Sequence, residues 1–129
     1  MTNVKLNYIL ICDQAFFDEK GKTSIIGTFN RIESKGTPAI HPKFTIVVNI
    51  MGDKNTSHIE RIEIINLQDN KTIAFIEKQI NFKDFDMHNF LGNFVNTIFP
   101  TFGKYWIKIS IDHNIISKKD EHYILVEKN

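Results

Sequence analysis

The sequence predicts an all-β fold, an antiparallel β-sandwich of about eight strands with immunoglobulin-like or jelly-roll topology. The first observation is composition: Ile occurs 22 times and Phe 11 times among 129 residues, whereas Ala occurs three times. Such β-branched and aromatic residues favour pleated strands. The second is the period-two alternation of apolar residues over 44–51 and 105–112. The third is turn chemistry that separates short apolar runs roughly every 8 to 14 residues.

Three strands are expected in the first part of the chain. Residues 6–12 are apolar on both faces over their second half, which is typical of a strand covered on two sides. Residues 23–33 form the second strand and residues 44–51 the third. The alternation places four side chains of the third strand on one face: Phe44, Ile46, Val48 and Ile50. Gly-, Asn- and Asp-containing turns are expected at residues 18–21, 35–38 and 52–55.

Four more strands are expected at residues 59–67, 72–82, 105–112 and 122–127. Asn and Asp in the segments between them tolerate the left-handed backbone that tight turns need. In the strand over 105–112, the inward stripe predicted by alternation is Tyr105, Ile107, Ile109 and Ile111.

The segment from Lys83 to Phe102 has the least regular pattern. Its apolar residues come close to a helical spacing of three and four: Phe85, Phe90, Leu91, Phe94, Val95 and Ile98. This spacing predicts a short helix near residues 85–92, followed by a strand at roughly 94–99, and Gly92 argues against a longer helix. We expect this segment to cover the second face of the first strand.

Composition indicates one globular domain over residues 1–129. The formal charge of +1 is too small for the positive field on which nucleic-acid binders rely, so no nucleic-acid partner is expected. The single cysteine excludes an internal disulfide and favours a reducing compartment. The sequence contains neither a signal-peptide pattern nor an apolar run long enough for a membrane helix. A cytoplasmic protein without a membrane partner is therefore expected.

Two glycine motifs suggest nucleotide chemistry but do not complete its patterns. Lys20-Gly21-Lys22-Thr23 contains the core of a phosphate-binding loop, yet Phe16 stands where that loop needs its first glycine. A polar hairpin tip is the favoured interpretation. Gly27 is followed by no further glycines of a dinucleotide fingerprint, and it is expected to mark a bulge or a close backbone approach within a strand.

Metal and catalytic motifs are also incomplete. The five histidines have no metal-ligand spacing, and no cofactor or metal is expected: His41, His58, His88, His113 and His122. Asp13, Asp18 and Glu19 form an acidic cluster that matches no calcium loop and is interpreted as a solvated turn. Cys12 ends an apolar strand and is predicted to be a core thiol rather than a nucleophile.

Several landmarks together resemble a family of small bacterial proteins known only as a domain of unknown function. The segments that carry the resemblance are Tyr8–Asp13, Ile25–Phe29, Pro42, Gly103–Ile107 and Asp112. The resemblance implies a compact immunoglobulin-like sandwich. It implies no activity, so no catalytic residue can be transferred from it.

Three functional hypotheses follow. The first is a non-catalytic interaction module that binds a protein partner or forms a homo-oligomer through an edge strand or an exposed aromatic residue. The second is a β-sandwich that binds a small ligand or a carbohydrate on an aromatic platform. The residues expected to contact the partner or ligand are Trp106, Phe102, Tyr105 and Tyr123. The third, an enzyme, would need an acid–base pair assembled from loop residues such as Asp13, Asp112 and His113. No catalytic arrangement is visible in the sequence, so a non-enzyme is expected.

Overall fold

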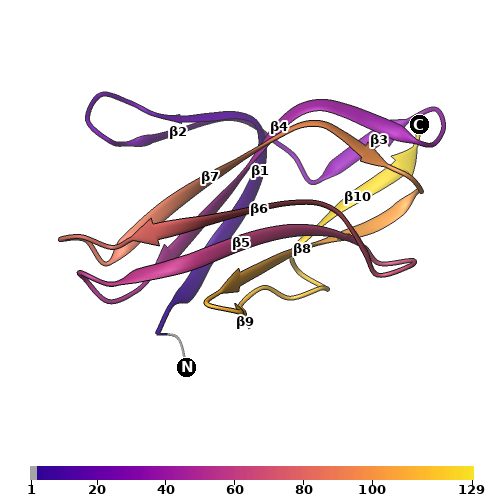
Figure 1. The fold of residues 1–129 in the computed structure, drawn as a ribbon. Coiled ribbons are helices and arrows are strands. Elements are labelled where there is room, and N and C mark those ends of the chain that lie inside the picture. The colour runs from indigo at the N-terminus through magenta and orange to yellow at the C-terminus, as the bar shows by residue number, and fades with distance from the viewer. Residues whose placement is uncertain (1–2) are drawn as a thin grey trace.

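The computed structural model describes residues 3–129 as two β-sheets packed against each other (Figure 1). Within that range the structure has strands and turns only, and therefore no helix that could cross a membrane. The strands are β1 (Lys5–Phe17), β2 (Thr23–Thr28), β3 (Arg31–Ser34), β4 (Ala39–Met51), β5 (Ser57–Asn66), β6 (Lys71–Asn81), β7 (Met87–Phe99), β8 (Gly103–Ile111), β9 (Asn114–Ile115) and β10 (Tyr123–Lys128).

The two sheets are a four-stranded sheet in the order β2-β1-β4-β7 and a larger sheet in the order β3-β10-β8-β5-β6, to which β9 adds beside β8. All pairs are antiparallel except β3 and β10, which are parallel. The predicted all-β sandwich is thus confirmed, but its second sheet is mixed rather than purely antiparallel. The parallel pair arises because β3 follows a crossover from the first sheet and enters the second sheet at its edge.

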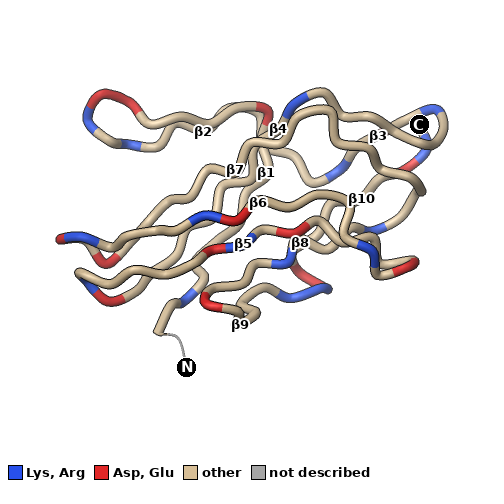
Figure 2. Tube along the Cα trace, in the orientation of Figure 1, with Lys and Arg blue, Asp and Glu red and all other residues tan. Residues whose placement is uncertain are grey.

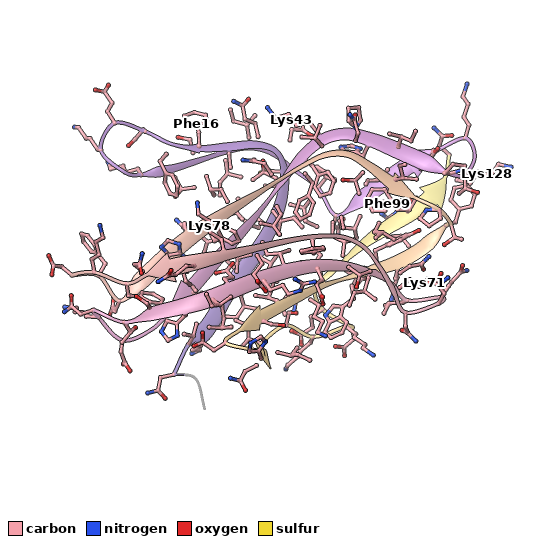
Figure 3. The ribbon with its side chains drawn as sticks, in the orientation of Figure 1. Phe16, Lys43, Lys71, Lys78, Phe99 and Lys128 are labelled. Carbon is pink, nitrogen blue, oxygen red and sulfur yellow. The ribbon has the colours of Figure 1, made fainter. Side chains whose placement is uncertain are left out.

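The core lies between the inner faces of the sheets and follows the alternation read from the sequence. Phe44, Ile46, Val48 and Ile50 of β4 are fully buried, as are Tyr105, Ile109 and Ile111 of β8, with Ile107 almost so. Phe99 also lies between the sheets, whereas Phe16 and Lys43 lie on the outer side of the first sheet (Figure 3). Burial of one face at period two fixes the register of these strands.

The expectation of a helix near residues 85–92 is wrong, because residues 87–99 form β7 and pair with β4 along its full length. The apolar residues that imitated a helical spacing belong to both faces of this strand. Phe90 and Phe94 are buried in the core, whereas Val95 and Ile98 are exposed on the outer face. The segment is therefore an edge strand of the first sheet and does not cover β1.

The expected strand over residues 23–33 is divided into β2 and β3, which belong to different sheets. Gly27 lies directly opposite Asp13 and has a φ of 70°, a left-handed conformation that side chains rarely adopt. A Cβ atom at this position would collide with the Asp13 carboxylate. The predicted close approach at Gly27 is confirmed.

The outer face of the first sheet is partly covered by the hairpin of β1 and β2. Cys12, Thr45 and Val47 are buried on this face although they lie outside the main core. The side-chain amide of Asn89 on β7 donates a hydrogen bond to the Thr23 hydroxyl of β2 over 2.7 Å. The hairpin therefore folds over the outer face as far as β7, the strand at the opposite edge of the sheet. Cys12 is a buried thiol whose pKa is raised by burial; it is buried as predicted, but on the outer face of the first sheet and not between the sheets.

Candidate functional site

A cleft of about 490 Å³ opens between the sheets beside β1. Its apolar floor comes from Ile9 and Ile11 of β1, Ile107 of β8 and Phe29 in the connection from β2 to β3. Its rim is polar and comes mainly from Asp120, Glu121 and His122 in the loop before β10, and from Tyr123 at the start of β10. The cleft is thus a hollow with an apolar base and an acidic side.

The cleft follows a stretch of β1 that has an unpaired edge. β2 pairs only with residues 12–17 of β1, whereas β4 pairs with residues 5–12 on the other side. The Ile11 carbonyl points away from β4 and accepts a hydrogen bond from the Phe29 amide over 2.8 Å. Because backbone groups alternate in direction along an antiparallel strand, the N–H and C=O groups of Ile9 also point to this side. Among the described residues no strand pairs with them there.

The acidic rim is held by local contacts in the loop before β10. The Lys118 amide donates to Nδ1 of His122 over 2.8 Å, and the Lys118 ammonium lies 3.8 Å from the Glu121 carboxylate. Within residues 3–129, Asp120 has no ion pair. The rim therefore offers a carboxylate to a basic group that enters the cleft.

Of the four residues predicted to contact a partner, Tyr123 alone lines this cleft. Phe102 is half-buried against the core. Trp106 lies on the outer face of the second sheet, opposite the isoleucine stripe, but only 7% of its surface is exposed. Tyr105 is fully buried, so its ring has no surface on which a ligand can stack.

Tyr105 ties the β7–β8 connection to the core. Its hydroxyl donates to the Thr101 carbonyl over 2.8 Å and accepts from the Thr101 amide over 3.0 Å. Replacement by phenylalanine is expected to lower the free energy of unfolding by about 1–2 kcal/mol, because it leaves a backbone donor and an acceptor without their partner. Urea unfolding measures this, with the half-exposed Tyr8→Phe as control. Equal losses in the two variants would contradict the structural role of this hydroxyl.

Of the loop residues suggested for an acid–base pair (Asp13, Asp112 and His113), Asp112 has side-chain contacts with β5. Oδ2 of Asp112 lies 2.6 Å from Nδ1 of His58, and its Oδ1 accepts from the Ile59 amide. His58 is on β5 and Asp112 follows β8, 54 positions away in sequence. Sequence spacing carries no signal for this pair, because it depends on which strands are neighbours.

The contact continues from His58 to Thr56, whose hydroxyl lies 3.0 Å from Nε2. This Asp–His–Thr order resembles that of a nucleophilic triad, but the hydroxyl has one proton and donates it to the Asp53 carbonyl over 2.6 Å. The proton of the Thr56 hydroxyl is thus directed at a backbone carbonyl and not at Nε2 of His58, unlike that of a nucleophile activated by a histidine. The arrangement fits a clamp between the β4–β5 turn and the end of β8.

Glu60 is the most unusual polar residue of the structure. Its side chain is fully buried on the inner face of β5, and neither carboxylate oxygen has a hydrogen-bond partner within residues 3–129. Burial raises its pKa to about 8, so the carboxyl is mainly protonated at neutral pH. Sequence reasoning missed this residue, although Glu60, Ile62 and Ile64 share one phase of the β5 alternation and therefore one face.

The described part of the chain contains no group of three or more His, Cys, Asp or Glu side chains that could hold a metal ion. No curated protein matches the sequence. A family of unknown function, DUF6941, matches residues 7–120, which is most of the chain. The chain therefore belongs to the family of unknown function DUF6941.

Proposed function

We propose that this protein is a non-catalytic interaction module that binds an extended segment of a protein partner, or of a second copy of itself, along the free edge of β1. The observation that supports the proposal is the unpaired stretch of β1 beside the cleft. An exposed strand edge offers backbone donors and acceptors in register, and an adjoining apolar hollow accepts alternate side chains of an added strand.

The charge of the cleft rim favours a particular kind of segment. Asp120 and Glu121 stand on the loop before β10, while Ile9 and Phe29 form the base. An extended segment with alternating apolar residues and a basic residue at one end fits both features. The backbone supplies affinity in this mode of binding, and the side-chain hollow supplies selectivity.

Ile9→Pro tests the proposal, because it removes an N–H group that points to the free edge rather than to β4. Proline is tolerated at such edge positions, so the pairing of β1 with β4 is expected to persist. Random dodecapeptides displayed on phage are selected on the wild-type protein, and the affinities of the selected peptides are measured by calorimetry. We expect binding to weaken at least about tenfold in Ile9→Pro, since one ladder hydrogen bond is lost and the edge is blocked.

The exposed Val95→Ala on β7 is the matched control and should bind the selected peptides as the wild type does. Light scattering over a concentration series tests the second-copy form of the proposal in the same variants. A wild-type monomer that enriches no peptide, or peptides that bind Ile9→Pro unchanged, would refute the β1 edge as the binding surface.

The cleft volume supports a second candidate function, the binding of a small ligand or a carbohydrate. A volume of about 490 Å³ falls within the roughly 300–1,000 Å³ typical of small-molecule sites. Tyr123 lines the cleft and is the aromatic residue that this candidate assigns to ligand contact. Glycan-array binding that is lost in Tyr123→Ala would favour it, whereas signals at background level would count against it.

A further inference from the structure

The outer face of the second sheet carries an aromatic ring under two ammonium groups. Nζ of Lys119 lies 5.2 Å from the centre of the Trp106 ring, and Nζ of Lys108 lies 5.8 Å from it. The indole N–H of Trp106 is buried and, among the described residues, has no acceptor. A buried donor without an acceptor is uncommon in native structures and calls for an explanation.

A second ring with a lysine lies directly beside Trp106. Tyr123 of β10 is the cross-strand neighbour of Trp106 on β8, so the two side chains share the outer face. Nζ of Lys104 lies 4.5 Å from the centre of the Tyr123 ring. The lysine–aromatic strip is defined here as Trp106, Tyr123, Lys104, Lys108 and Lys119.

The strip has more positive charge than its surroundings neutralise. Lys108 lies 3.6 Å from the Glu63 carboxylate, but within residues 3–129 neither Lys104 nor Lys119 has an ion pair. The acidic residues that follow Lys119, Asp120 and Glu121, line the cleft between the sheets. Figure 2 shows this basic-to-acidic change of sign along the loop between β9 and β10.

We propose that the lysine–aromatic strip binds an acidic segment of a protein partner. Carboxylates of that segment pair with Lys104 and Lys119, next to the rings of Tyr123 and Trp106. Charge-assisted hydrogen bonds of this kind are stronger than neutral ones, and aromatic anchors are frequent at protein interfaces. The strip includes no residue of β1, so this contact does not depend on strand addition there, although Tyr123 also lines the cleft.

An acidic protein segment fits these residues better than a nucleic acid does. Proteins bind single-stranded nucleic acids by stacking bases on open aromatic faces along an extended basic groove. Here ammonium groups already lie over the rings of Trp106 and Tyr123, and the whole chain has a formal charge of only +1. The strip offers discrete cations, which match the carboxylates of an acidic segment.

Trp106 is the only tryptophan of the chain, so its fluorescence reports on this site alone. The protein is titrated with octaglutamate at low salt, and a saturable change in tryptophan emission is expected. Lys104→Ala and Lys119→Ala should each weaken the apparent affinity about threefold, and the double variant about tenfold, as for exposed ion pairs. Lys43→Ala, a lysine on the outer side of the first sheet, is the control and should leave the affinity unchanged (Figure 3).

Four outcomes would overturn the proposal: no emission change up to millimolar octaglutamate, equal affinity in the double variant, tighter binding of octathymidylate than of octaglutamate, or loss of octaglutamate binding in Ile9→Pro. The third outcome would identify a nucleic-acid surface, and the fourth would place the acidic segment at the β1 edge. Unchanged octaglutamate binding in Ile9→Pro supports the strip as a separate site, whatever becomes of the peptides selected for that edge.

Discussion

Replacement of Glu60 by leucine is expected to raise the free energy of unfolding at pH 7 by about 3 kcal/mol. The carboxyl has a pKa of about 8 in the folded protein, whereas its ordinary value is 4.5, so at pH 7 the folded state must hold a proton that the unfolded state releases. Because pH 7 lies below the folded pKa, the penalty there is set by the roughly 2.5 pH units between 4.5 and 7, at about 1.4 kcal/mol for each, or about 3 kcal/mol in all. A leucine of similar size removes the penalty and adds apolar contacts with the surrounding core.

The same argument gives the dependence of wild-type stability on pH. Because the folded pKa lies above the unfolded one, the stabilisation is complete below pH 4.5 and is lost progressively up to pH 8. Glu60→Gln keeps a polar group of the same shape but does not ionise, so its stability should vary less over this window. Urea unfolding of the wild type and both variants from pH 4.5 to 8 measures the effect. A Glu60→Leu protein less stable than the wild type at pH 7 would show that the carboxyl has an essential partner.

Much of the fold could be predicted because the buried strands have one simple pattern. The apolar residues of β4 and β8 alternate at period two, and those on the inner face of each strand belong to the core. Glu60 stands in the same phase as Ile62 and Ile64, so the pattern also contained the information that it faces inward. Its charge concealed this, since carboxylates are rarely buried without a partner.

The features that the sequence analysis predicted wrongly or missed all depend on which strands are neighbours in the sheets. β7 imitated a helix because apolar residues occupy both faces of an edge strand, and only its pairing with β4 separates Phe94 from Val95. The contact between His58 and Asp112 likewise requires β5 and β8 to be adjacent. The alternation in β8 places Trp106 on the face opposite the isoleucine stripe, as the structure has it. Of the two lysines over its ring, however, Lys119 comes from a loop whose path the sequence does not specify.

The loop between β9 and β10 connects the two proposed binding surfaces. Its acidic residues Asp120 and Glu121 line the cleft beside β1, and Lys119 lies over Trp106 on the outer face of the second sheet. One short loop therefore gives opposite charge to two neighbouring surfaces. A partner that reaches both surfaces would need a basic group at the cleft and an acidic group at the lysine–aromatic strip. Binding would therefore select partners in which these two charges are arranged in that order.

The largest destabilisation is expected from Phe44→Ala, which should lower the free energy of unfolding by about 4 kcal/mol. Phe44 is fully buried on β4 and stacks on Phe94 of β7, with ring centres 5.3 Å apart. It also meets Phe29 and Phe99 at ring-centre distances of 6.4 Å each, so it joins three segments of the chain. Truncation leaves a cavity that surrounding strands can fill only in part, since their backbones are fixed by sheet pairing.

Phe75→Ala is the matched control, because Phe75 on β6 is 56% exposed and its ring lies 4.0 Å from Cζ of Arg61. It should cost less than about 1 kcal/mol, in line with a surface cation–π contact. Circular dichroism during urea unfolding compares the two variants at pH 7, and differential scanning calorimetry gives their midpoints. Similar losses for both phenylalanines would mean that Phe44 is not the centre of the aromatic core, and the assignment of the β4 inner face would have to be revised.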